Sequence, residues 1–147
     1  MKPCLIVSVL LFFIYACKDA KQTGATQKPN TSIENSLTTS IARGKVLYQD
    51  FCAQCHLPNG KGISGNFPPL AGSDWFSTQR VNTITAVKYG LSGPIVVNGV
   101  EYNGVMASQG LSNQEIVDVL NYCMSSWGNT QQTPITLEEV QAIKKNP

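Results

Sequence analysis

The sequence contains little histidine and little charge. His56 is the only histidine in 147 residues, and charged residues make up 14% of the chain. Eleven basic residues nearly balance nine acidic residues, which excludes the strongly basic surface that nucleic-acid binding requires. Hydrophobic residues make up 42% of the chain, enough for one folded domain. A lone histidine also excludes any site that needs two histidine ligands from this chain.

The sequence also lacks a hydrophobic run long enough to span a membrane. The apolar run at residues 5–15, LIVSVLLFFIY, has eleven residues, whereas a membrane-spanning helix needs about 20. This run follows Lys2, as in a signal peptide. Its end, Ile14-Tyr15-Ala16-Cys17, resembles a bacterial lipobox, which predicts cleavage before Cys17 and lipidation of that cysteine. A secretory signal cut after Ala16 is the alternative.

These features divide the chain into three parts. Residues 1–16 are predicted to be a signal peptide of the lipoprotein type. Residues 17–39 contain the lipidated Cys17 and a polar segment that favours a flexible tether. Residues 40–147 are predicted to be the folded domain, with a short C-terminal helix. We therefore expect an extracytoplasmic, lipid-anchored protein on the periplasmic side of a bacterial membrane.

Sequence patterns predict four helices and one β-hairpin within the domain. Asn98-Gly99 between apolar β-formers is a strong hairpin signal, and the segment after it, EYNGVMASQG, is interpreted as a loop. Glycine and proline in residues 57–73 predict another loop. The expected helices are one from Ser40 through Phe51, one across TQRVNTITAVKYG to Gly90, one after a capping box of Ser112 and Glu115, and one after a capping box at Thr136.

Residues 51–56, FCAQCH, carry three possible sites. A structural zinc ion needs four ligands, and this motif offers three. A thioredoxin-like disulfide is expected after a strand and at the start of a helix, whereas this motif follows a predicted helix. The third hypothesis is covalent haem, for which CxxCH is the signature. Cys52 and Cys55 lie on one side of a helical turn and can add to two vinyl groups, and His56 can then bind the iron.

The second axial ligand must come from another residue type, because His56 is the only histidine. Methionine is the soft ligand of electron-transfer haems. Met124 lies on the apolar stripe of a predicted helix, where methionine usually fills the core. Met106 lies in the predicted loop after the hairpin, so we predict Met106 as the ligand.

These segments together resemble the class I c-type cytochromes in their small bacterial form. The resemblance covers about residues 41–129 and rests on GKVLYQDFCAQCH, NGKGISGNFPPLAGSDW, YNGVM and LSNQEIVDVLNYCMSSWGN. It implies an all-α cytochrome c fold around one covalent haem c, here with a small β-hairpin insertion. It also implies thioethers at Cys52 and Cys55, with His56 and Met106 as the axial ligands of the iron.

The resemblance implies further contacts. Gly44 should allow the first and last helices of the fold to approach closely near Tyr122. The Pro68 carbonyl, rather than that of Pro69, should accept a hydrogen bond from the His56 ring, which fixes the ring's orientation. Leu70 should line the haem pocket.

Four other residues have more than one interpretation. Trp75 and Tyr102 either line the haem pocket, where they can bond to propionates, or pack in the core. Cys123 is interpreted as a small buried hydrophobe rather than a reactive thiol. Arg80 is interpreted as part of a solvated helix face rather than a partner of a propionate.

The predicted function is that of an electron carrier and not an enzyme. Its expected partners are redox proteins such as a terminal oxidase, a reductase or a quinol-oxidising complex, and a lipid anchor would hold it at the membrane. The alternative is a haem sensor or catalytic subunit in which Met106 is displaced by a ligand. A second alternative is a non-haem redox or zinc module.

Overall fold

The structure, a computed structural model, describes residues 31–130 and 133–145. The predicted signal peptide and Cys17 lie outside these residues. No helix in the described residues is both long and apolar enough to cross a membrane. In chain order the described elements are α1 (Thr31–Phe51), α2 (Ala53–His56), α3 (Trp75–Thr78), α4 (Arg80–Tyr89), β1 (Leu91–Val97), β2 (Val100–Met106), α5 (Asn113–Met124) and α6 (Leu137–Ala142).

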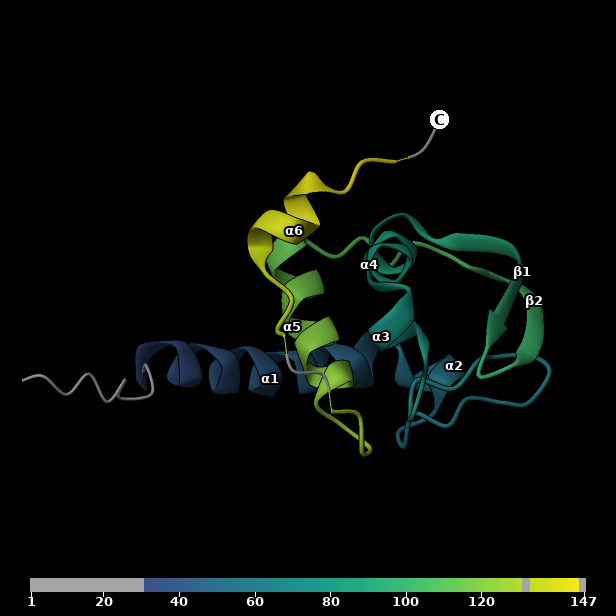
Figure 1. Ribbon diagram of the computed structural model, residues 1–147, viewed down its shortest axis with the longest axis horizontal. Coiled ribbons are helices and arrows are strands. Elements are labelled where there is room, and N and C mark those ends of the chain that lie inside the picture. The colour runs from purple at the N-terminus through teal and green to yellow at the C-terminus, as the bar shows by residue number, and fades with distance from the viewer. Residues whose placement is uncertain (1–30, 131–132, 146–147) are drawn as a thin grey trace, which may run out of the picture.

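Helices α1 and α5 cross and form the frame of the domain, and α4 lies between α5 and the hairpin (Figure 1). The crossing is close because Gly44 on α1 has no side chain. A Cβ atom there would collide with the backbone carbonyl of Asp118 and would lie 2.9 Å from the Cβ of Tyr122. The predicted close approach at Gly44 is therefore confirmed.

A buried carboxylate joins the two crossed helices. Asp118 on α5 is 2% exposed and accepts hydrogen bonds from Ser40 Oγ at 2.7 Å and from Arg43 Nε at 2.6 Å. The predicted helix start at Ser40 is wrong, because α1 begins at Thr31 and Ser40 is buried within it. The Ser40 hydroxyl thus bonds to another helix rather than capping its own.

Residues 31–39, which we expected to belong to a flexible tether, are helical. Most of this segment is polar, so it has no apolar stripe to predict a helix. A helix that is already formed extends at low cost, because each added residue gains a hydrogen bond.

Aromatic rings fill the core beside the crossing. Tyr48 is fully buried, and its ring centroid lies 5.5 Å from that of Tyr122 and 4.8 Å from that of Trp127. Cys123 and Met124 are 3% and 2% exposed and belong to the same hydrophobic cluster. The core positions predicted for Cys123 and Met124 are therefore confirmed.

The hairpin predicted at Asn98-Gly99 is also confirmed. Strands β1 and β2 pair antiparallel from Val97↔Val100 at the turn to Leu91↔Met106 at the open end. The loop predicted after the turn is wrong for residues 101–106, which belong to β2. Asn103-Gly104 has the composition of a turn, but pairing with β1 holds the segment extended.

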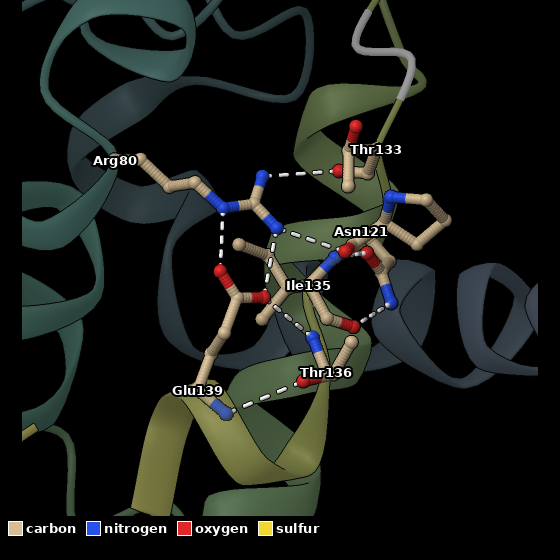
Figure 2. Close-up of polar contacts among 7 residues, drawn as sticks. Arg80, Asn121, Thr133, Ile135, Thr136 and Glu139 are labelled. Carbon is tan, nitrogen blue, oxygen red and sulfur yellow. Dashed lines mark hydrogen bonds and ion pairs between the residues drawn. The ribbon is translucent and has the colours of Figure 1, made fainter. Parts of the chain in front are cut away.

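The C-terminal segment packs against α4 and α5. The predicted capping boxes at Ser112/Glu115 and Thr136/Glu139 are both present, and α4 ends before Gly90 as expected. The interpretation of Arg80 as a solvated residue is wrong, because its guanidinium bonds to the Glu139 carboxylate through two nitrogens (Figure 2). No local pattern indicates this pairing, because the two residues lie 59 positions apart.

Candidate functional site

The residues predicted to hold the haem lie around one cleft. Its larger part has a volume of about 340 Å³ and is lined by Cys52, Cys55, His56 and Met106. A smaller part of about 90 Å³ is also lined by Cys52, His56 and Met106. The larger volume lies in the range of pockets that bind small molecules and cofactors, about 300–1,000 Å³.

The CxxCH motif forms the short helix α2 after a break at the end of α1. The His56 amide donates to the Cys52 carbonyl at 2.9 Å, which closes the turn and brings both thiols to the cleft. Cys52, Cys55 and the buried Cys123 form no disulfide with one another. Burial, and then the neighbouring Cys55, raises the pKa of Cys52 to about 11, so the thiol stays protonated at neutral pH.

His56 is oriented by one backbone contact. Its Nδ1 lies 3.0 Å from the Pro68 carbonyl oxygen, the contact that the sequence led us to expect. The Nδ1–H therefore donates to Pro68, and Nε2 is left to bind a metal. Burial lowers the pKa of His56, although the bond to Pro68 acts in the opposite direction. The neutral form, which is the metal-binding form, is thus favoured.

The glycine-rich loop after His56 returns to the ring because two glycines permit tight packing. A Cβ atom at Gly62 would clash with the Phe67 carbonyl and lie 2.6 Å from the Pro68 carbonyl oxygen. Gly60 packs against the Trp127 ring, 2.6 Å from where its Cβ would lie. Both glycines have positive φ angles, 62° and 68°, which glycine adopts without strain.

The hairpin supplies the wall that carries Met106. Three cross-strand pairs line the larger cavity, and these are Leu91↔Met106, Gly93↔Gly104 and Ile95↔Tyr102. They are alternate positions, so they share one face of the hairpin. In the middle of this face stand two glycines. A Cβ atom at Gly93 would meet no heavy atom within 4 Å, and one at Gly104 would meet only the Asn66 carbonyl oxygen at 3.8 Å.

This glycine pair leaves the centre of the hairpin face open between larger side chains at either end. A flat group such as a porphyrin fits such a face, and the two thiols and the imidazole line the same cavity. The residues present therefore fit a covalent haem.

The other predicted pocket residues divide between the two cavities. Tyr102 lines the larger one, and Leu70 and Trp75 line the smaller one. The Trp75 Nε1–H donates to the Val96 carbonyl at 2.8 Å. The indole nitrogen is thus hydrogen-bonded to strand β1 of the hairpin. Met124 is not among the residues that line either cavity within the described part of the chain.

Sequence reasoning missed the apolar residues that complete the cleft. The strand alternation of Leu91, Gly93 and Ile95 was available as a signal, but Pro94 between them obscured it. Phe67 follows the glycines of the loop and lines the larger cavity. Among the described residues, no three His, Cys, Asp or Glu side chains are placed to hold a metal ion.

Comparison with known proteins gives consistent matches. The family model for cytochrome c matches residues 41–127. One cytochrome c-552 of Thermus thermophilus is 40% identical over 117 residues, which cover 74% of this chain and 78% of the relative. A second Thermus thermophilus cytochrome c-552 is 41% identical over 112 residues, or 70% of this chain and 85% of the relative. The cytochrome c subunit of a quinone alcohol dehydrogenase from Gluconacetobacter polyoxogenes is 28% identical over 138 residues, covering 84% of this chain and 27% of that subunit.

Proposed function

Because the chain belongs to the cytochrome c family and binds one covalent haem c, we propose that it is a membrane-tethered one-electron carrier between extracytoplasmic redox proteins. The observation that carries this proposal is the convergence of Cys52, Cys55, His56 and Met106 on one cavity. Bound haem supplies an iron that accepts and releases one electron.

Each of these four side chains has a distinct role. Cys52 and Cys55, which both line the cavity, would hold the haem by adding their S–H groups across its two vinyl groups. His56 would bind the iron through Nε2, since its Nδ1 is engaged with Pro68. Met106 would supply a second ligand from the end of β2. An external ligand would then have to displace one of these two side chains.

The ligand set is tested by absorption spectra of the haem-loaded protein, oxidised and reduced, with and without carbon monoxide. We expect low-spin spectra in both states and slow carbon monoxide binding. Met106→Ala should give a high-spin ferric form, whereas Met124→Leu should not, because Met124 lies in the core. A high-spin ferric wild type, or rapid carbon monoxide binding to it, would instead support the sensor or catalytic alternative.

The partners we propose are redox proteins such as a terminal oxidase, a reductase or a quinol-oxidising complex. Support comes from the relative that is a cytochrome c subunit of a quinone alcohol dehydrogenase. With basic and acidic residues nearly equal in number, docking should depend more on apolar contact than on long-range charge steering. Electron exchange with a candidate partner should then change little between low and high salt.

The tether proposal rests on the N-terminal sequence. Residues 1–16 would be removed as a signal peptide and Cys17 lipidated, with residues 17–30 left as the tether before α1. The wild type expressed in bacteria should pellet with membranes and carry a lipid mass, and Cys17→Ala should release it to the soluble fraction. A wild type that is soluble and begins at Cys17 without added mass would instead favour the secretory signal.

A further inference from the structure

The C-terminal segment, residues 133–143, lies outside the residues matched by the family model, yet it contacts both ends of α4. At the start of α4, the Arg80 guanidinium donates to both Glu139 carboxylate oxygens, at 2.7 and 2.8 Å. The same group donates to the Thr133 carbonyl at 3.0 Å and to the Pro134 carbonyl at 2.8 Å (Figure 2). Four bonds from one guanidinium thus fix this end of α4 to the segment.

The other end of α4 is bonded to the same segment. The Lys88 ammonium donates to the Val140 carbonyl at 2.6 Å and to the Ile143 carbonyl at 2.9 Å. The Tyr89 hydroxyl donates to the Ile143 carbonyl at 3.0 Å. A cation suits the end of α6, where backbone carbonyls have no helical partner.

The segment is in turn fixed to the frame of the domain. Asn121 on α5 accepts from the Ile135 amide at 2.7 Å and donates to the Ile135 carbonyl at 3.2 Å. Ile135 and Val140 are 3% and 0% exposed and lie in the main hydrophobic cluster. The segment therefore links α5 to both ends of α4.

The end of α4 that Lys88 holds is also the base of the Met106 strand. The Ser108 hydroxyl donates to the Lys88 carbonyl at 2.9 Å. Gly90 faces Met106 so closely that a Cβ atom there would lie 2.7 Å from the Met106 carbonyl oxygen, and Leu91 pairs with Met106 across the strands. The Met106 backbone thus packs directly against the C-terminal end of α4. A shift of this end of α4 would therefore move Met106.

From these contacts we propose that residues 133–143 are a positioning element for Met106, and that Arg80 and Lys88 are the positioning residues through which it acts. The segment fixes α4 against the frame, and α4 fixes the base of β2. The inference rests on the proposed function, in which Met106 binds the iron. The consequence of this positioning is that the Met106 sulfur dissociates from the iron rarely, which keeps external ligands out.

The test is the rate at which cyanide binds the ferric haem-loaded protein, because cyanide must displace Met106. Lys88→Met removes the ammonium donors and keeps an unbranched, largely apolar side chain. Arg80→Met removes the guanidinium donors at the other end of α4, with a shorter side chain. Each variant loses bonds from a charged donor, so we expect cyanide to bind about tenfold faster or more. Lys145→Met, at an exposed position in the same region, is the control and should bind cyanide at the wild-type rate.

Arg80→Lys and Lys88→Arg keep the charge, and they should restore slow binding in part because Arg and Lys differ in geometry. If circular dichroism shows that a methionine variant does not fold, the charge-conserving variant at the same position is measured in its place. Folded variants that bind cyanide at the wild-type rate, with only a lower thermal midpoint, would overturn the positioning role. If Met106→Ala leaves the wild-type spectrum unchanged, the proposed ligand set fails instead.

Discussion

Asn98 at the hairpin turn and Asp74 before α3 exchange two hydrogen bonds. The Asn98 backbone N–H donates to Asp74 Oδ1 at 3.0 Å, and the Asp74 backbone N–H donates to Asn98 Oδ1 at 2.9 Å. The Asn98 side chain also donates to the Gly72 carbonyl at 3.1 Å. The turn of the hairpin is therefore fixed to the loop that follows the CxxCH motif.

Asn98→Ala should lower the free energy of unfolding by about 2 kcal/mol. The alanine loses the side-chain hydrogen bonds, and it must adopt the positive φ of 51° found at Asn98. Asn98→Gly loses the same bonds without the backbone strain, so it should cost about 1 kcal/mol. Urea unfolding of both variants separates the two contributions. Equal losses would show that backbone strain at this position is negligible.

Gly44→Ala should destabilise the protein by about 3 kcal/mol or more, because the new methyl group would overlap the Asp118 carbonyl. The crossed helices must then separate or bend. Val46→Ala is the control, since Val46 is 57% exposed on the same helix and should change stability by less than about 0.5 kcal/mol. The measurement is the midpoint of urea unfolding. A Gly44→Ala protein as stable as the control would contradict the close helix crossing.

The protein should lose stability in acid partly through Asp118. Burial alone would raise the pKa of Asp118, but hydrogen bonds from Arg43, Ser40 and Gln114 outweigh it and hold the pKa below its usual value. A depressed carboxyl pKa stabilises the fold above the unfolded pKa of about 3.9. That contribution disappears as the pH falls through the lower, folded pKa.

Asp118→Asn tests this linkage. It should cost about 1–3 kcal/mol at pH 7, with the lower part of the range favoured because the Arg43 side chain is 51% exposed. It should also reduce the loss of stability between pH 5 and acid pH, measured by urea unfolding across about pH 2–7. Asp50→Asn, at an exposed position on α1, is the control. Identical pH profiles for wild type and Asp118→Asn would contradict the assignment.

Gly104→Leu should reduce haem incorporation, because its side chain would enter the open centre of the hairpin face. Filling a site that a ligand needs costs about 1–3 kcal/mol or more. The measurement is the ratio of haem absorbance to protein in purified samples. Val100→Leu, at a position on the same strand that is 47% exposed, is the control. Full haem content in Gly104→Leu would show that haem does not occupy this face.

Local signals in the sequence predicted much of the site. The CxxCH spacing, Asn98-Gly99 and both capping boxes act over a few residues, so they can be interpreted without the fold. The approach of Pro68 to His56 was predicted from a resemblance, and here it follows from glycines that permit the loop to turn back.

Long-range contacts explain what the sequence did not predict. Arg80 and Glu139 meet only because α6 packs against α5 and brings Glu139 to the start of α4. Residues 101–106 become a strand because β1 supplies their hydrogen-bond partners. The helical residues 31–39 lack the apolar periodicity that sequence reasoning needs. In the first two cases the deciding partner was absent from the local sequence.

The register of the hairpin lets its turn end change in length independently of Met106. The hairpin leaves and rejoins the domain at one place, where Leu91 pairs with Met106, and side chains alternate between faces with a period of two. Two residues added to each strand near the turn would therefore lengthen it without moving Met106 or inverting the face toward the cavity. The Asn98–Asp74 contact would be lost by that change, so the length of this hairpin is matched to the loop that it touches rather than to the ligand that it delivers.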